Sequence, residues 1–278
     1  MSAVHLSVNG VTLGAELREP ARPNGLTLAL LHGFTGSAAG WGAHLDALAA
    51  AGLRVVALEL LGHGASEAPA DPARYAFERT RDDLLAALEQ LGTQPAATVV
   101  LGYSLGGRVA LYAALGARFR GLVLESASPG LTAAEERAAR RASDAALAAR
   151  IEREGVPAFV AEWERQPLFA SQASLPAEAR AALRALRLRN SAVGLANGLR
   201  GMGTGAQPPL HESLAALRTP CLLIAGALDA KFAQIATQMA GRLPQAELRV
   251  VPGAGHTVHL ERPEAFDVAV IAFCEQLS

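Results

Sequence analysis

The sequence predicts an α/β fold in which a mostly parallel central sheet carries helices on both faces. Apolar runs of strand length alternate with stretches of helical length along most of the 278 residues, and this alternation is typical of parallel strands joined by crossover helices. The runs are almost continuously apolar, as expected of strands covered on both sides. At 51% hydrophobic residues, the chain is long enough to bury a sizeable core.

A hairpin opens the chain, with Asn9-Gly10 as its turn. The later strands are expected within residues 26–32, 54–60, 97–104, 121–128, 219–226 and 246–253. The helices between them are expected at residues 41–51, 77–91, 105–116, 231–242 and 263–277. This order predicts a doubly wound sheet.

One long segment, residues 131–215, contains no convincing strand and predicts several helices, among them 132–155 and 175–191. A helical insertion between two strands of a parallel sheet lies over the carboxyl ends of the strands, where such sheets bind ligands. We therefore expect an α/β core formed by residues 1–130 and 216–278, and a helical cap, or lid, formed by the inserted segment.

The charge balance argues against one class of partner. There are 26 Asp plus Glu and 25 Lys plus Arg, of which only Lys231 is lysine, so we expect no nucleic-acid partner. No apolar run approaches the roughly 18 residues that span a bilayer, and no secretion signal is recognisable. A cytoplasmic protein without membrane insertion is expected. Cys221 and Cys274 are expected to be buried free thiols, and the oligomeric state is left open.

The stretch GYSLGGR, residues 102–108, follows an apolar strand and precedes a helix. It has the G-x-S-x-G pattern of a nucleophile elbow, in which a tight strand-to-helix turn presents the serine and leaves no room for neighbouring side chains. We therefore expect Ser104 to be the reactive residue.

Two further residues complete a catalytic triad in the order Ser, Asp, His. Asp229 comes just after the strand at 219–226, and His256 lies in a glycine-rich loop after the last strand. A serine needs a neutral imidazole to take its proton, and the imidazole needs a carboxylate to fix its tautomer. His259 competes with His256, which we favour because glycines free its loop.

The loop His32-Gly33-Phe34 follows the strand at 26–32, where this arrangement places one donor of an oxyanion hole. The expected donors are the backbone N–H groups of Phe34 and Leu105. His32 and His63 are interpreted as structural hydrogen-bonding residues. The sequence suggests no metal site and no phosphate-binding loop, so we expect no metal and no cofactor.

Several segments resemble the MenH family, the 2-succinyl-6-hydroxy-2,4-cyclohexadiene-1-carboxylate synthases, within the α/β-hydrolase superfamily. They are LHGFTGSAAGW, GYSLGGRVALYAAL, LESASPGL, FVAEWERQPLFASQ, LRGMGTGAQPPL and GALDAKF. The resemblance covers the cap as well as the core, and cap sequences are where α/β hydrolases differ most. It implies an α/β-hydrolase fold with the cap inserted after the strand that follows the nucleophile helix.

The resemblance also implies a reaction in menaquinone biosynthesis. A lyase of this family eliminates pyruvate from 2-succinyl-5-enolpyruvyl-6-hydroxy-3-cyclohexene-1-carboxylate. Ser104, assisted by His256 and Asp229, would act as the base that removes a ring proton next to the succinyl carbonyl. The N–H groups of Phe34 and Leu105 would hold the enolate oxygen.

A small-molecule substrate with several carboxylates explains the arginines, because a guanidinium group pairs with a carboxylate through two hydrogen bonds. Arg108 lies one helical turn after Ser104 and would face the same side. Arg140 and Arg187 are the best positional matches in the cap to the family's carboxylate-binding arginines. Tyr103 and Trp163 would line the pocket. The close rivals within the cap are Arg141, Arg184 and Arg189.

In one loop the sequence departs from the family's pattern. Residues 59–64 are ELLGHG, whereas the family commonly has Asp-x-Pro-Gly-His-Gly. The loop backbone can differ without the proline, but no catalytic role is lost.

There are two alternatives to the lyase for the same residues: a serine hydrolase and a protein without enzymatic activity. A serine hydrolase acting on an ester, thioester or carbon–carbon bond of a carboxylated molecule needs the same triad, although Arg108 and the arginine-rich cap favour the lyase. A non-enzymatic receptor or scaffold with this fold would be expected to lack part of the triad, and here the triad is complete.

Overall fold

The computed structural model describes residues 2–278 and contains one eight-stranded sheet in the order β1-β2-β4-β3-β5-β6-β7-β8. The first two strands pair in antiparallel fashion, β2 joins β4 in the same way, and all other neighbours are parallel. The strands are β1 (Ser2–Val8), β2 (Val11–Arg18), β3 (Thr27–Leu31), β4 (Arg54–Leu58), β5 (Thr98–Tyr103), β6 (Gly121–Glu125), β7 (Cys221–Gly226) and β8 (Ala246–Val251).

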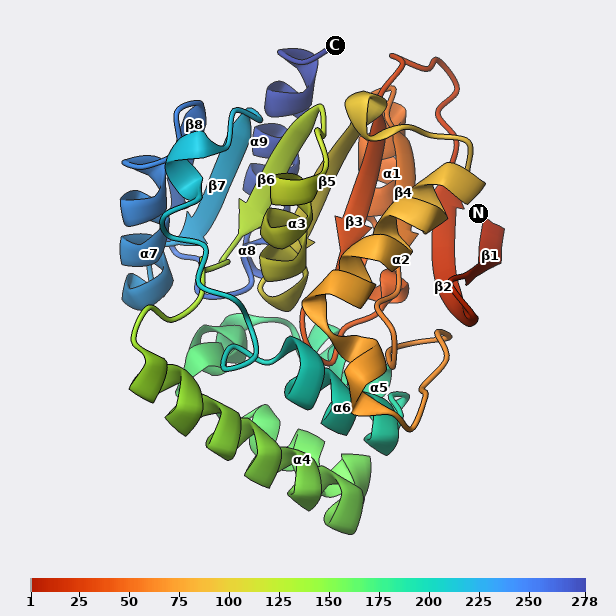
Figure 1. Cartoon of the computed structure of the whole chain (residues 1–278). Coiled ribbons are helices and arrows are strands. Elements are labelled where there is room, and N and C mark those ends of the chain that lie inside the picture. Colours follow the sequence, from red (N-terminus) through yellow and green to blue (C-terminus); the bar gives the residue numbers. More distant parts are fainter. Residues whose placement is uncertain (1) are drawn as a thin grey trace.

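Helices cover both faces of this sheet (Figure 1). One face carries α2 (Phe77–Gln90), α3 (Leu105–Gly116) and α7 (Ala230–Ala240). The opposite face carries α1 (His44–Ala50), the short α8 (Val258–Glu261) and α9 (Pro263–Glu275). The predicted α/β fold class is therefore confirmed.

The central strands show why their sequences are continuously apolar. All five residues of β3 are buried. Because successive side chains of a strand point to opposite faces, Ala29 and Leu31 pack into the core on one side, and Leu28 and Leu30 into the core on the other. A strand with both faces covered cannot alternate apolar with polar residues.

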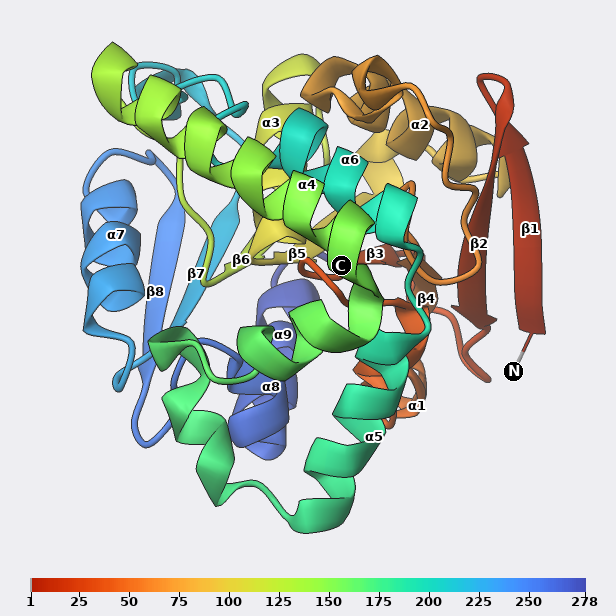
Figure 2. The ribbon, with the colours of Figure 1, turned by 90° about the horizontal axis from the view of Figure 1, so that it is seen from below.

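The segment inserted after β6 folds into α4 (Ala134–Trp163), α5 (Ala177–Leu188) and α6 (Ala192–Met202). Seen from below, these helices lie across the ends of the central strands (Figure 2). Their shared apolar cluster includes Ile151, Phe159 and Leu195. Within α4 the helix breaks at Gly155, whose φ of 82° is left-handed, and Pro157 follows in the first turn of the second part, where its missing N–H is tolerated.

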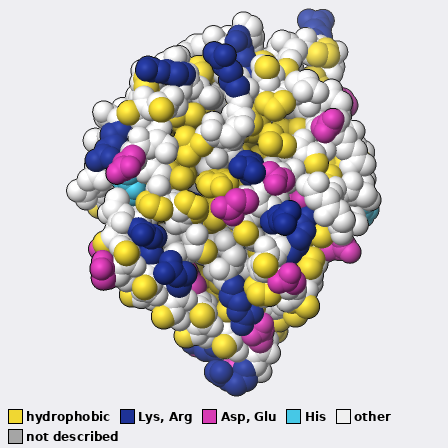
Figure 3. Space-filling view, viewed as in Figure 1, with side chains coloured by type: hydrophobic (Ala, Val, Ile, Leu, Met, Phe, Trp, Pro, Cys, Tyr) yellow, Lys and Arg dark blue, Asp and Glu magenta, His cyan; other side chains and the backbone are white. Residues whose placement is uncertain are grey.

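Three smaller outcomes concern the surface and the thiols. Cys221 and Cys274 are free and buried, as predicted. Within residues 2–278 we find no helix with the length and apolar character needed to traverse a bilayer. On the face shown in Figure 3, positive and negative side chains are interspersed over the cap and the core.

Candidate active site

The parallel strands bring the three predicted triad residues together at one edge of the sheet. Ser104 follows β5, Asp229 follows β7, and His256 lies in the loop after β8. Although these residues are far apart in sequence, the carboxyl ends of parallel strands all meet at the same edge.

The turn at Ser104 is strained. The serine has φ of 50° and ψ of −104°, a conformation that non-glycine residues rarely adopt. A Cβ on Gly102 would lie 2.3 Å from the Gly106 carbonyl oxygen, and one on Gly106 would lie 2.1 Å from that of Leu31. The flanking glycines are therefore required, and the turn presents the serine hydroxyl beyond the end of the strand.

Hydrogen bonds link the three side chains in the order that a triad requires. His256 Nδ1 lies 2.7 Å from Asp229 Oδ2, and His256 Nε2 lies 3.1 Å from Ser104 Oγ. Pairing with the carboxylate places the ring proton on Nδ1, so that Nε2 can accept the serine proton. Asp229 also caps α7, because its Oδ1 accepts the N–H of Phe232 at 3.2 Å.

His259, the competing histidine, has a separate partner. Its Nδ1 lies 2.7 Å from Glu125 Oε2, and Glu125 Oε1 accepts its backbone N–H at 3.0 Å. Both side chains are buried. The geometry therefore brings His256, rather than His259, to Ser104.

Two groups that hold the histidine loop were not predicted from the sequence. The carboxylate of Glu261 accepts the N–H of Gly255 at 2.7 Å and that of Thr257 at 3.2 Å, the two amides on either side of His256. The Thr257 hydroxyl is bonded to Tyr103 Oη at 2.8 Å and to Gln172 Nε2 at 2.9 Å. An acidic residue shortly after the histidine was the only available sequence signal, whereas the contact with Gln172 depends on how the cap packs.

The predicted oxyanion donors both lie beside the serine. Phe34 and Leu105 line the same cavity as Ser104, and within residues 2–278 neither backbone N–H donates a hydrogen bond. Gly33 lets the loop approach closely, since a Cβ there would lie 2.6 Å from the ring of Tyr103. Two amides of this kind can stabilise an oxyanion.

His32 and His63 hold neighbouring loops. His32 Nδ1 pairs with the Gly33 carbonyl at 2.8 Å, and its Nε2 accepts the N–H of Leu60 at 3.1 Å. Burial lowers the pKa of His32 to about 4 and that of His63 to about 3. Both rings are therefore neutral at neutral pH, which agrees with a structural role. The adjoining loop at residues 59–64 is tied to the core by Glu59, which accepts the N–H of Ala38 at 3.1 Å.

A cavity of about 360 Å³ opens between the core and the cap at Ser104 and His256. Four of the five predicted substrate-binding residues line it: Tyr103, Arg108, Arg140 and Trp163. None of the residues around this cavity is Asp or Glu. Its wall is therefore suited to a negatively charged molecule.

Arg108 is set into this wall. Its Nη1 donates to the Met202 carbonyl at 2.8 Å, and its guanidinium lies 6.0 Å from the centroid of the Phe77 ring. Burial, together with the charge of Arg140, lowers the pKa of Arg108 to about 9. A buried guanidinium is stabilised when a carboxylate approaches it. Arg140 is itself held by Asp144 at 2.8 Å.

Arg187 does not line the main cavity. It is buried in an adjoining hollow of about 50 Å³, which shares Phe34, Tyr103 and Phe169 with that cavity. Its Nη1 pairs with Glu164 at 3.2 Å. Each of the rival arginines lies elsewhere: Arg141 donates to the Gly205 carbonyl, Arg184 pairs with Glu164, and Arg189 lines a hollow near β1 and β2.

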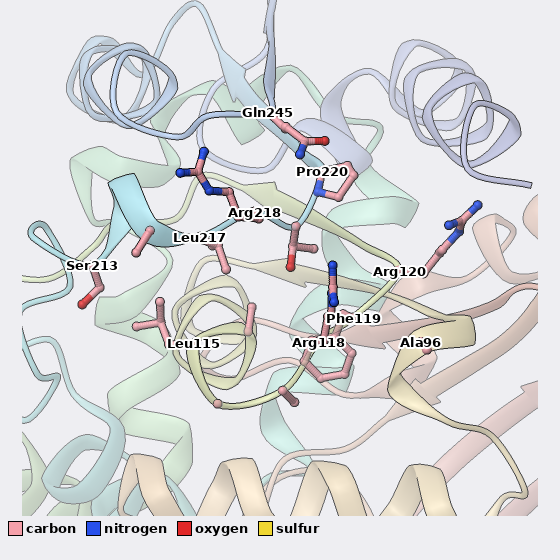
Figure 4. A pocket seen from close by; sticks show the side chains of 15 residues that line it. Ala96, Leu115, Arg118, Phe119, Arg120, Ser213, Leu217, Arg218, Pro220 and Gln245 are labelled. Carbon is pink, nitrogen blue, oxygen red and sulfur yellow. The ribbon is translucent and has the colours of Figure 1, made fainter.

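A larger hollow, of about 1000 Å³, lies at the other end of the sheet (Figure 4). Four of its lining residues lie one or two positions before a strand: Ala96 before β5, Arg120 before β6, Pro220 before β7 and Gln245 before β8. We call it the amino-end groove. No triad residue lines it. As for metals, the part of the chain that the structure describes holds no group of three or more His, Cys, Asp or Glu side chains arranged around a common point.

Comparison with known proteins agrees with this geometry. Residues 28–269 match the family described as "Alpha/beta hydrolase family". A Klebsiella pneumoniae protein named 2-succinyl-6-hydroxy-2,4-cyclohexadiene-1-carboxylate synthase is 39% identical over 252 residues, which are 90% of this chain and 92% of that protein. The chain belongs to the MenH family of alpha/beta hydrolases. A Bacillus subtilis protein, provisionally given the same name, is 43% identical over 245 residues, 87% of this chain and 88% of its own length.

This chain superposes on solved structures both of MenH and of other enzymes with the same fold. The structure of MenH from Staphylococcus aureus superposes with a TM-score of 0.90 at 32% identity, covering 95% of this chain and 98% of that one. A thermophilic esterase from Thermogutta terrifontis, solved with malate bound, superposes with a TM-score of 0.86 at 27% identity, covering 100% and 99%. The MenH likeness therefore rests on both sequence and structure, whereas the fold is shared with esterases.

Proposed function

We propose that this protein is a carbon–oxygen lyase of menaquinone biosynthesis that acts in the cytoplasm. Its substrate is 2-succinyl-5-enolpyruvyl-6-hydroxy-3-cyclohexene-1-carboxylate, and its products are pyruvate and 2-succinyl-6-hydroxy-2,4-cyclohexadiene-1-carboxylate. The main support for the proposal is that Arg108 lines the same cavity as the hydrogen-bonded pair Ser104 and His256, and that no Asp or Glu side chain lines this cavity. A polycarboxylate can be held there while the serine reaches its ring.

The triad supplies a base rather than a nucleophile. Ser104 removes the ring proton next to the succinyl carbonyl and passes it to His256, whose charge is balanced by Asp229. The resulting enolate oxygen is held by the N–H groups of Phe34 and Leu105. The enolate then re-forms the carbonyl while its electron pair makes a ring double bond between C2 and C3. The existing C3=C4 double bond shifts to C4 and C5, and the bond from C5 to the enolpyruvyl oxygen breaks.

The surrounding residues orient the substrate. Arg108 and Arg140 bind its carboxylates, Tyr103 and Trp163 line the cavity, and Arg187 acts from the adjoining hollow. The inserted segment of residues 131–215 serves as a cap that separates the reaction from solvent, which strengthens each ionic contact within the cavity.

The experiment is a pyruvate assay coupled to lactate dehydrogenase, with the purified chain, the enolpyruvyl substrate and no added metal. We expect pyruvate release that Ser104→Ala abolishes. Strong turnover of simple esters without pyruvate release would instead favour a serine hydrolase acting on a carboxylated molecule. This second candidate is supported by the likeness to the Thermogutta esterase.

A further inference from the structure

Lys231, the only lysine of the chain, lies in the wall of the active-site cavity. It occupies the first turn of α7, two positions after Asp229. Its side chain is exposed, and within residues 2–278 it forms no ion pair or hydrogen bond. A cation in this position is available to a ligand.

The neighbouring Phe232 places this cation beside the triad. The Phe232 ring packs edge-on against His256, with centroids 4.5 Å apart. Lys231 Nζ lies 5.7 Å from the centroid of the same phenyl ring. The ammonium group therefore belongs to the His256 side of the cavity, whereas Arg108 and Arg140 come from α3 and α4.

The charges of the cavity match those of the proposed substrate. Three cationic side chains line it, those of Arg108, Arg140 and Lys231, and no acidic side chain does. The substrate carries carboxylates on its ring, on its succinyl arm and on its enolpyruvyl group. Without Lys231, only two cationic side chains would line the cavity itself for three carboxylates, since Arg187 lies in the adjoining hollow.

The three cationic side chains differ in mobility, and this difference indicates which carboxylate each of them binds. Both arginines are fixed by protein contacts, Arg108 through the Met202 carbonyl at 2.8 Å and Arg140 through Asp144 at 2.8 Å. Fixed guanidinium groups suit carboxylates that stay on the product. Lys231 has a flexible stem and lies at the exposed edge of the cavity, which suits a group that must depart.

We propose that Lys231 binds the carboxylate of the enolpyruvyl group and keeps this contact while the C–O bond breaks and the group becomes pyruvate. The inference rests on the proposed lyase function. As the ring C–O bond breaks, its electron pair stays on the enolpyruvyl oxygen and gives the enolate of pyruvate. Protonation of the methylene carbon of that enolate then yields pyruvate, so one proton is lost from the ring and one is gained by the leaving group. The leaving group becomes more negative during cleavage, and a cation beside it favours the transition state over the ground state.

Steady-state kinetics on three variants test the proposal. Lys231→Met should lower kcat/KM about tenfold and weaken product inhibition by pyruvate by a similar factor, in the range typical of one charge-assisted hydrogen bond. Lys231→Arg keeps the charge and should retain most of both. Arg218→Met, which removes one exposed charge at the amino-end groove, is the matched control and should stay within about twofold of wild type. Wild-type kcat/KM together with unchanged pyruvate inhibition in Lys231→Met would overturn the proposal.

A spectroscopic test uses the single lysine. Reductive methylation with ¹³C-formaldehyde labels only Lys231 and the α-amino group, so the lysine gives one NMR signal and the terminus gives an internal control. Titration with pyruvate should move the lysine signal to saturation and leave the other in place. If pyruvate is released by the enzyme but the lysine signal does not move, Lys231 has no such role. A shifted lysine signal in a protein that releases no pyruvate from the enolpyruvyl substrate would support the pyruvate-binding site at Lys231 and refute the proposed lyase function.

Discussion

The central sheet has a hollow at each end, a cavity of about 360 Å³ under the cap and the amino-end groove of about 1000 Å³. Both are lined by arginine side chains. In the cavity, Arg108 and Arg140 share one wall with Ser104 and His256. In the groove, Figure 4 shows the guanidinium groups of Arg120 and Arg218 pointing to opposite sides.

The difference suggests that the convergence of side chains on one point, rather than the size of a hollow, distinguishes the proposed reactive end of the sheet. Loops after parallel strands are free to vary in conformation, and helices begin there with unpaired N–H groups. Ser104 lies at such a junction and Leu105 is the first residue of α3. The amino ends of the strands receive the ends of helices instead, and Arg120 is used there to bind the Leu277 carbonyl.

The largest effect that separates the two ends should come from the serines. Ser104→Ala removes the proposed base, and kcat for pyruvate release should fall by about 10³-fold or more. Ser213→Ala, a groove residue, should leave kcat unchanged. The free energy of unfolding in urea provides the control for folding. If Ser104→Ala retained substantial activity, the proposed role of the triad would be wrong.

The second effect compares arginines. Arg108→Ala removes a carboxylate partner from the cavity, and kcat/KM should fall about 100-fold, near the upper range for a charged hydrogen bond. Arg218→Ala removes an equally positive group from the groove and should change kcat/KM by less than about twofold. Equal behaviour of the two variants would remove the distinction between the two ends.

A smaller effect should come from the support behind the histidine. Glu261→Ala leaves the amides of Gly255 and Thr257 without their acceptor, and we expect kcat to fall about tenfold with KM nearly constant, because the loop no longer fixes His256. Glu261→Gln keeps one acceptor and should be intermediate. Glu275→Ala, at the exposed end of α9, is the control. A folded Glu261→Ala enzyme with wild-type kcat would refute this positioning role.

The smallest effect concerns the free energy of unfolding, which a substitution in the cavity should raise, whereas the preceding substitutions lower activity. The pKa of Arg108 is lowered to about 9 by burial and by Arg140, so below pH 9 the folded protein holds a charge that the unfolded chain holds more easily. Arg108→Met should therefore raise the free energy of unfolding at pH 7 by about 1 kcal/mol while activity is lost.

The stability difference between Arg108→Met and the wild type should depend on pH. The pKa of Arg108 is lower in the folded protein than in the unfolded chain, so a rise in pH favours the folded wild type. The stability advantage of Arg108→Met over the wild type should therefore be smaller at pH 10 than at pH 7, whereas Arg218→Met should match the wild type at both pH values. Urea unfolding at pH 7 and pH 10 measures this. A destabilised Arg108→Met protein at pH 7 would contradict the account.

Much of the fold was predictable because its signals are local. Strands such as β3 are apolar throughout since both faces are buried, and the glycines around Ser104 are required by contacts of 2.3 Å or less that any Cβ would make. Helix boundaries shifted only slightly. The predicted helix at 41–51 begins at His44, because residues 38–41 form a 3₁₀ turn. The site roles themselves stay predictions.

Long-range packing set the limit on what could be predicted. The glycines of its loop favoured His256 over His259, but the partners that separate the two histidines, Ser104 and Glu125, lie far away in the sequence. Arg140 and Arg187 lie on different helices of the cap, α4 and α5, so sequence spacing could not show that Arg187 turns toward Glu164 while Arg140 reaches the cavity. The direction of each side chain depends on how α4 and α5 pack.

The central claim is that Ser104 acts as a base and forms no covalent intermediate. Intact-protein mass spectrometry of the chain, quenched during steady turnover of the enolpyruvyl substrate, tests it directly. We predict a single species with the mass of the unmodified chain while pyruvate accumulates. A population that carries an acyl group on Ser104 and decays once the substrate is consumed would contradict the account.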